Sequence, residues 1–285
     1  MPDNRMKNAT AKRRMTDEAT ANPEADGPDG PDEGDRYRAP ALDKGLDIVE
    51  LLAEQAGGLT RAEITKALGR NASEIYRMLE RLVARQYVTR SEGGDRYTLS
   101  LKLFALAHRH PPMERLIAQA LPLMHRFATE VEQSCHLSVY DRGNLLVIAQ
   151  VNGPGTWGIA VRLGSRVGLV DTSSGRTILA WQTPEQRAHM LAEHTKVKGE
   201  AAIDHEALSA ACARIRKAGF SRKDSQQIFG VTDVTFPVLG PSGQAIAALT
   251  CPFLKRIDEY VAPSLEDTTE LLRGTVEELS VFRAP

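Results

Sequence analysis

The chain has 285 residues, enough for about two domains of ordinary size. Hydrophobic residues make up 42% of it, sufficient for ordinary globular cores, and the formal net charge of −1 neither favours nor excludes nucleic acid as a partner. No apolar run reaches the roughly 18 residues of a membrane span, no signal-peptide core is present near the N-terminus, and the three cysteines lie far apart without a CxxC motif. We therefore expect a cytoplasmic protein with reduced thiols and no membrane partner.

The first 38 residues are predicted to form a disordered tail. The segment Asp26–Asp35 reads DGPDGPDEGD and offers almost nothing apolar to bury. Order is expected to begin near Pro40, because apolar residues with helical spacing follow over residues 41–56. The buried stripe of this first helix is predicted to be Leu42, Leu46, Val49 and Leu52.

Two further short helices, joined by a tight turn, are predicted within residues 59–82. Thr60 caps the first of them and Glu63 follows three residues later, which is the spacing of a capping box. Gly69 supplies the turn, and the second helix begins near Asn71. Two amphipathic helices around such a turn have the outline of a helix-turn-helix, which makes DNA the first partner to test.

A β-hairpin is predicted directly after the second helix. Gln86–Arg90 and Arg96–Leu99 are short extended runs on either side of a Gly93-Gly94 turn, as in the wing of a winged helix. Residues 60–109 contain ten Lys and Arg against five Asp and Glu, a local net charge of +5 that suits contact with phosphates. A solvated surface of mixed charge is the alternative reading of this balance.

A linker helix over 101–108 and the break at Pro111-Pro112 complete a DNA-binding domain over residues 39–110. Side chains near the start of a recognition helix reach base edges in the major groove, and the wing can contact the backbone. Glu74 would accept from cytosine or orient Arg70 or Arg77, and Arg90 and Arg96 could instead pair with Glu92 or Asp95. An exposed face of a protein–protein module is the alternative to DNA. The candidate DNA-binding residues are Thr60, Arg61, Arg70, Asn71, Ser73, Glu74, Tyr76, Arg77, Arg81, Arg90 and Arg96.

Residues 113–285 are predicted to form a second domain of the α+β class. Its apolar patterns indicate hairpin strands mixed with helices, which is typical of an antiparallel sheet with helices packed on it. The strands are expected at 136–140, 145–151, 158–163, 231–239 and 244–251, and the helices at 113–131, 174–181, 184–194, 205–218 and 262–282.

Signals for catalysis are weak in this second domain. Gly153–Gly158 matches GxGxxG by letter, but a strand rather than a helix is expected after it, which excludes a dinucleotide site. Cys135 and His136 are adjacent on a strand and therefore point to opposite faces of the sheet. The polar run Asp171–Gly175 precedes a helix, where free amides can bind a small anion. Simple N-capping by its Ser and Thr residues is the alternative.

Six stretches of the chain carry a resemblance to a known family. In the first domain they are ALDKGLDIVELLAE, LTRAEITKALGRNASEIYRMLERLVARQYVTR and RYTLSLKLFAL, and in the second VRLGSRVGLVDTSSGRTILA, GFSRKDSQQIFGVTDVTFPV and PSGQAIAALT. With them, the chain from about Ala39 to Phe282 resembles the IclR-type bacterial transcriptional regulators. The resemblance implies a winged helix-turn-helix joined by a linker helix to a GAF/PAS-like effector-binding domain.

The resemblance also implies partners and a ligand site. The partners would be a double-stranded DNA operator, a small-molecule effector such as a carboxylate, and further copies of the chain in a homodimer or homotetramer; no cofactor or metal is expected. Such regulators often carry Cys at the position of Asp233 and Glu at that of Gln226, and a Ser-Thr pair where this chain has Ser73-Glu74. The implied ligand-binding residues are Val161, Leu163, Ser173, Ser174, Lys223, Asp233 and Thr250, with Pro252 beside them.

The sequence thus predicts a ligand-responsive transcriptional regulator, a repressor that senses a small organic or aromatic acid. Two other classes stay open at this point. One is an enzyme that acts on a small acid and carries a fused DNA-binding module. The other is a thiol redox sensor that uses Cys135 or Cys251.

Overall fold

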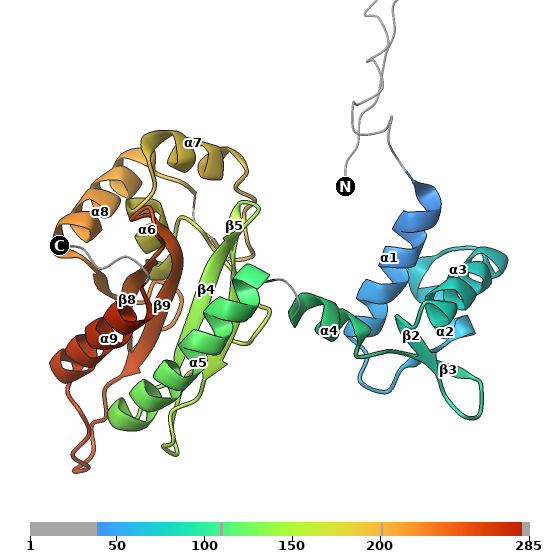
Figure 1. Cartoon of the computed structure of the whole chain (residues 1–285), viewed down its shortest axis with the longest axis horizontal. Helices are drawn as coiled ribbons and strands as arrows, with labels where there is room; N and C mark the ends of the chain where they lie inside the picture. The colour runs from blue at the N-terminus through green and yellow to red at the C-terminus, as the bar shows by residue number, and fades with distance from the viewer. Residues whose placement is uncertain (1–38, 109–110, 201, 281–285) are drawn as a thin grey trace, which may run out of the picture. The chain divides into compact units, whose positions relative to one another are not determined.

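The computed structural model describes residues 39–108, 111–200 and 202–280. The chain forms two compact units that divide between Leu103 and Phe104 (Figure 1). The tail predicted over residues 1–38 lies outside the described residues. The linker helix predicted from the sequence is present as α4 (Lys102–His108).

The N-terminal unit is a small helical domain with a short sheet. Three of its strands form an antiparallel sheet in the order β1-β3-β2, so the predicted hairpin gains a third strand from the segment before the helix-turn-helix. The elements are α1 (Pro40–Ala53), β1 (Leu59–Thr60), α2 (Arg61–Leu68), α3 (Ala72–Ala84), β2 (Val88–Arg90) and β3 (Arg96–Leu99).

Local capping explains where the two helices of the helix-turn-helix begin and end. The Thr60 hydroxyl accepts from the Glu63 amide while the Glu63 carboxylate accepts from the Thr60 amide, the reciprocal capping box that the spacing predicted. Gly69 ends α2 at φ +60°, a left-handed conformation that glycine adopts without a Cβ clash. Asn71 then caps α3, its side chain accepting from the Ser73 amide.

The core of this unit brings α1, α2 and α3 together with the sheet. Its fully buried side chains come from all three helices and from β2 and β3. The predicted stripe of α1 was wrong in part, because Leu42 and Leu46 are 61% and 49% exposed while Ile48 and Leu52 are buried. The buried core consists of Ile48, Leu52, Ile64, Ile75, Leu79, Val88 and Tyr97.

The C-terminal unit is an α+β domain around a six-stranded antiparallel sheet in the order β6-β5-β4-β9-β8-β7. Helices α5 and α9 pack against each other and cover one face, and α6, α7 and α8 lie on the other (Figure 1). The elements are α5 (Pro111–Val131), β4 (Cys135–Asp141), β5 (Asn144–Val151), β6 (Arg166–Val167), α6 (Ser173–Ala180), α7 (Pro184–Ala192), α8 (His205–Ala218), β7 (Ser221–Asp224), β8 (Val231–Leu239), β9 (Ala245–Leu254) and α9 (Leu265–Leu279).

One strand expected from the sequence is absent from the described residues. Residues 158–163 adopt no regular secondary structure, and the edge strand β6 forms instead at Arg166–Val167, opposite Leu146 and Leu145 of β5. The segment before β6 is therefore a loop that crosses toward α6, and this loop contributes to the site described below.

The two faces of the central strands differ in chemistry because successive side chains alternate. In β4, Cys135, Leu137 and Val139 join the core under α5 and α9. His136 points to the other face, where it lies opposite Thr250 of β9. This alternation leaves a row of polar side chains on the face that α6 covers.

Candidate functional site

The exposed face of α3 carries basic side chains. Ser73, Arg77 and Arg81 follow one another at intervals of four residues, so they form one stripe along the helix, and all three are exposed. Among the described residues, no hydrogen bond or salt bridge engages the guanidinium group of Arg77 or Arg81. These two cations are therefore available to an external anion without the loss of an internal contact.

Glu74 and Arg70 are both paired with α1. The Glu74 carboxylate lies 2.9 Å from Nζ of Lys44, and this contact lowers the pKa of Glu74. Arg70 makes a salt bridge with Asp47. Glu74 thus makes its hydrogen bond with Lys44 rather than with Arg70 or Arg77, the partners considered from the sequence. The ammonium group of Lys44 offsets the negative charge of Glu74 and so reduces the repulsion between Glu74 and a nearby phosphate.

The remaining candidates on α2 and α3 have local partners. The Asn71 side-chain oxygen accepts from both the amide and the hydroxyl of Ser73, at 2.9 Å each. Arg61 lies over the ring of Tyr76 at 5.4 Å, a cation–π contact between the two helices. Thr60 is occupied by its capping box. These contacts orient the N-terminal end of α3.

The two wing arginines fold back onto the unit. Nε of Arg90 donates to the carbonyl of Gly94 at 2.6 Å. Nη1 of Arg96 donates to the carbonyl of Gly58 at 2.9 Å and lies 3.7 Å from the Glu63 carboxylate. Neither arginine pairs with Glu92 or Asp95, the alternative that their closeness in sequence suggested. Both side chains are nevertheless exposed.

In the C-terminal unit, a small cavity of about 60 Å³ lies between the start of α6, the sheet and two loops. Five predicted ligand residues line it: Val161, Ser173, Ser174, Asp233 and Thr250, and Pro252 joins them. The rest of the lining comes from β4, the 158–165 loop with β6, the residue that caps α6, the segment between β7 and β8, and the start of β8. These further residues are His136, Ile159, Val167, Thr172, Ser225, Gln227, Ile228 and Val231.

Two predicted ligand residues lie elsewhere. Lys223 is exposed and lines a larger neighbouring cleft of about 440 Å³, which shares Ser173 and Asp233 with the cavity. Leu163 is 64% exposed and lines neither space. His136 was not among the predicted ligand residues. Its alternation with Cys135 was the available signal, because it places the imidazole on the opposite face from the apolar core.

The start of α6 supplies hydrogen-bond donors to this cavity. The Thr172 side chain caps the helix by accepting from the Gly175 amide, and the carbonyl of Thr172 accepts from the Arg176 amide. Ser173 and Ser174 occupy the first two helical positions, whose amides have no acceptor within the helix. The Ser174 hydroxyl hydrogen-bonds with Thr250 at 2.8 Å, and Thr250 with Thr235 at 3.0 Å.

Burial perturbs two titratable groups at the cavity. It lowers the pKa of His136 to about 4, so the imidazole is neutral near pH 7. It raises the pKa of Asp233 to about 6, although a Ser225 hydrogen bond acts in the opposite direction. Perturbed groups of this kind concentrate at functional sites.

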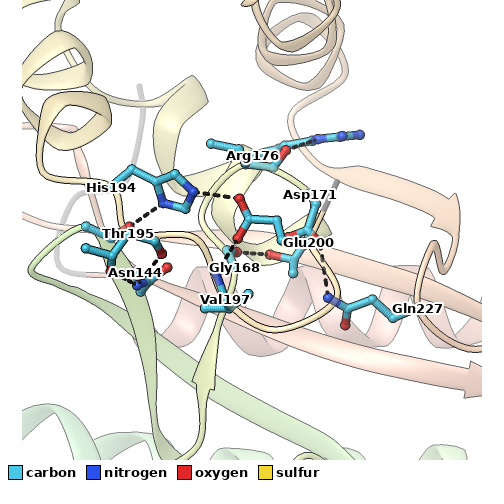
Figure 2. A network of polar contacts seen from close by, with 12 residues as sticks. Asn144, Gly168, Asp171, Arg176, His194, Thr195, Val197, Glu200 and Gln227 are labelled. Atoms are coloured by element: carbon cyan, nitrogen blue, oxygen red, sulfur yellow. Dashed lines mark hydrogen bonds and ion pairs between the residues drawn. The ribbon is translucent and has the colours of Figure 1, made fainter. Parts of the chain in front are cut away.

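A buried polar network centred on His194 and Glu200 lies between the segment after α7 and the β4–β5 turn (Figure 2). Nε2 of His194 and Oε1 of Glu200 are 2.6 Å apart, and their side chains are only 4% and 1% exposed. Nδ1 of His194 lies 2.7 Å from the carbonyl of Gly143 in the β4–β5 turn. The Val197 amide donates to the other Glu200 oxygen at 3.1 Å. These contacts tie the segment after α7 to the sheet.

The loop before α6 packs closely against Glu200 at Gly168. A Cβ at Gly168 would lie 2.1 Å from Oδ1 of Asp171 and 3.1 Å from Oε2 of Glu200, so only glycine allows this approach. The other Asp171 oxygen accepts from the side chain of Gln227, which lines the cavity (Figure 2). The position of the α6 N-terminus thus depends on packing around Glu200.

The three cysteines are all buried. Burial raises the pKa of the Cys135 thiol to about 12 and that of Cys251 well above its usual value. A redox-sensing thiol requires the reverse, a lowered pKa and solvent access. This environment argues against the redox-sensor reading.

Metal clusters and membrane-spanning helices are absent from the described residues. These residues contain no cluster of three or more His, Cys, Asp or Glu placed to hold a metal ion. None of their helices combines the length and apolar character needed to cross a membrane.

Comparison with known proteins relates both units to one family. The family described as "IclR helix-turn-helix domain" matches residues 41–92, and "Bacterial transcriptional regulator IclR C-terminal" matches residues 113–281. The chain is 26% identical over 224 residues to "HTH-type transcriptional regulator KdgR" of Escherichia coli (strain K12), covering 75% of this chain and 84% of the relative. It is 24% identical over 222 residues to "HTH-type transcriptional regulator XynR" of the same strain, covering 77% and 88%.

A solved structure has the same fold. The crystal structure of an IclR homolog from Microbacterium hydrocarbonoxydans, complexed with 4-hydroxybenzoate, aligns with a TM-score of 0.70 and 24% sequence identity over 84% of this chain and 97% of that one. The predicted α+β architecture with an N-terminal helix-turn-helix is thereby confirmed, as is the prediction of a DNA-binding regulator with an effector domain. The chain belongs to the IclR family of bacterial transcriptional regulators.

Proposed function

We propose that this regulator is a cytoplasmic homo-oligomeric repressor that binds a palindromic operator through α3 and the wing and senses a small organic or aromatic acid in the cavity at α6. The DNA-binding domain spans residues 39–110 and the effector domain residues 113–285. The observation that carries the proposal is the cavity, where Ser173 and Ser174 at the start of α6 meet a partly apolar lining that contains no Lys or Arg among the described residues. An enzyme is not proposed, because the relatives are transcriptional regulators.

The exposed leucines of α1 support a homo-oligomer. Leu42 and Leu46 lie one helical turn apart and are largely exposed. Burial of such apolar side chains against a second copy would stabilise an assembly. Two copies would place two recognition helices on two half-sites of one duplex. Analytical ultracentrifugation of wild type and of Leu42→Lys/Leu46→Lys checks this assignment, and unchanged mass in the double variant contradicts it.

Arg77→Ala is expected to weaken operator binding by about 1–3 kcal/mol, because Arg77 is the unpaired cation nearest the start of α3. The duplex to use is one selected from a random double-stranded pool by the wild-type protein, with affinity measured by fluorescence anisotropy. Arg85→Ala, at the C-terminal end of the same helix, removes the same charge and is the matched control. Equal losses in the two variants would refute base readout by Arg77.

Ser173→Pro is expected to weaken binding of a carboxylate effector by about 1.5–3 kcal/mol, since it removes one charge-assisted amide donor. Proline is tolerated at the first helical position, and Thr172 before it is extended at φ −99°, ψ 155°, as a residue preceding proline should be. Ser173→Ala keeps the amide and is the control.

The probe for this test is the acid that gives the largest thermal shift among propionate, lactate, glycerate, pyruvate, benzoate and 4-hydroxybenzoate. Affinity for it is measured by isothermal titration calorimetry, and binding to the selected duplex without the acid should be unchanged. If Ser173→Pro and Ser173→Ala bind the acid equally well, the α6 amides are not its anion site.

A further inference from the structure

His136 is the first of two cavity groups that can still form a hydrogen bond with a ligand. Its residue is 5% exposed, its Nδ1 is fully buried without a hydrogen-bond partner, and it lines the cavity. Buried polar atoms are almost always hydrogen-bonded, so an unpaired one at a cavity wall points to an absent ligand atom. Because burial keeps the imidazole neutral, each of its ring nitrogens is either one donor or one acceptor.

Asp233, on the far side of β9, is the second such group, because its carboxylate accepts from Ser225 and still has further acceptor sites. In the sheet, His136 lies opposite Thr250, whereas Asp233 lies opposite Pro252, two residues farther along the same strand. The two groups thus face the cavity from strands β4 and β8, on either side of β9. Above a pH of about 6 the Asp233 carboxylate only accepts hydrogen bonds, so a ligand atom that meets it must donate.

The charge of the lining restricts the ligand further. Neither Lys nor Arg occurs among the described residues that line the cavity. Lys223 pairs with Asp233 in the strand register but is exposed in the neighbouring cleft. The cavity therefore has one place for a carboxylate, the amides of α6, and a second carboxylate would face Asp233.

The volume of the cavity favours a short molecule. Its 60 Å³ correspond to roughly four to six water-sized positions, at about 10–15 Å³ each. The hydroxyls of Ser174 and Thr250, which line the cavity, already hydrogen-bond with each other, and Thr250 also does so with the buried Thr235. Among the described lining residues, the buried side-chain atom without a hydrogen-bond partner is Nδ1 of His136.

On the basis that this cavity is the effector site of the proposed function, we propose that it selects a short-chain hydroxy acid, whose carboxylate meets the α6 amides and whose hydroxyl groups hydrogen-bond with His136 and Asp233. A hydroxyl donates to the carboxylate and either donates to or accepts from the imidazole. A methyl group leaves His136 unpaired and fills none of the remaining acceptor sites of Asp233, and a keto oxygen cannot donate to Asp233. Sites built to bind a hydroxyl discriminate strongly against analogues that lack it.

Three acids with the same three-carbon chain test this selectivity in the wild-type protein. Propionate, lactate and glycerate carry no, one and two hydroxyl groups, and we expect affinity by calorimetry to rise about tenfold with each hydroxyl. Pyruvate and malonate should bind at least about tenfold more weakly than glycerate. Propionate binding as tightly as glycerate overturns the inference while leaving the effector site intact. If no acid of the panel binds, the proposed function fails as well.

Two apolar variants locate the selectivity. Asp233→Leu and His136→Phe remove the hydrogen-bonding groups with similar side-chain shape, and each is expected to lower glycerate affinity about tenfold while propionate affinity stays within about threefold. Lys223→Leu, in the neighbouring cleft, is the control and should leave the glycerate-to-propionate ratio unchanged. An unchanged ratio in both cavity variants overturns the assignment. Should either variant fail to fold, the wild-type series alone decides.

Discussion

Glu200→Ala is expected to lower the free energy of unfolding of the C-terminal unit by about 2–6 kcal/mol, because it leaves Nε2 of His194 and the amide of Val197 without hydrogen-bond partners, at about 1–3 kcal/mol each. The Gly143 carbonyl only accepts, so Nδ1 of His194 carries a hydrogen. The Val197 amide donates to Oε2 of Glu200. Nε2 of His194 and Oε1 of Glu200 hydrogen-bond with each other at 2.6 Å.

Glu200→Gln is the matched control for this prediction. A glutamine amide can donate to Nε2 of a neutral His194 while its carbonyl accepts from Val197, so every hydrogen bond of the network is kept. Its cost is expected to stay below about 1 kcal/mol. Glu259→Ala, an exposed glutamate, should remain within about 0.5 kcal/mol of wild type.

Urea denaturation followed by tryptophan fluorescence makes this measurement specific. The chain has two tryptophans, Trp157 and Trp181, and both lie in the C-terminal unit, so the signal reports that unit alone. A loss in Glu200→Gln equal to that in Glu200→Ala would mean that charge itself, rather than hydrogen bonding, holds the network. A loss below about 1 kcal/mol in Glu200→Ala would contradict the prediction altogether.

Local features of the DNA-binding unit followed from the sequence, whereas its charge pairs did not. The capping box joins residues three apart, and the Gly69 turn lies within one helical turn of its partners, so spacing alone indicates them. Arg96 donates to the carbonyl of Gly58, 38 residues away, and Glu74 of α3 pairs with Lys44 of α1. Such pairs depend on how helices and strands pack, which a single sequence does not specify.

In the effector site, too, local features followed from the sequence and contacts between distant segments did not. The helix start at Ser173 and the strands carrying Asp233 and Thr250 were recognisable, because caps and β-branched runs are local patterns. The loop over 158–163 was expected as a strand, since its composition resembles one, yet pairing with β5 occurs only at Arg166–Val167. For His136 the sequence showed its alternation with Cys135, and the strand register then placed it opposite Thr250.

Asp233→Asn and His136→Gln are expected to change the pH dependence of stability in opposite directions. The native pKa of His136 is about 4 against an ordinary 6.5, so the unfolded chain binds this proton more readily between those values, and stability falls as pH falls through them. The native pKa of Asp233 is about 6 against 3.8, so the native state binds that proton more readily, and stability rises as pH falls from 6 to 4. Each of these differences between the native and the ordinary pKa corresponds to about 3 kcal/mol of stability.

In wild type the contributions of His136 and Asp233 to the pH dependence of stability largely cancel between pH 7.5 and pH 4. Each variant removes one contribution, so the other becomes visible. Asp233→Asn should be about 3 kcal/mol more stable than wild type at pH 7.5 and lose this advantage by pH 4. His136→Gln should gain about 3 kcal/mol relative to wild type over the same decrease in pH. Urea denaturation at five pH values, expressed as variant minus wild type, removes the groups that all three proteins share. If the free energy of unfolding of both variants differs from that of wild type by the same amount at every pH, neither group has a perturbed pKa. The assignment of a neutral imidazole and an accepting carboxylate in the cavity would then be wrong.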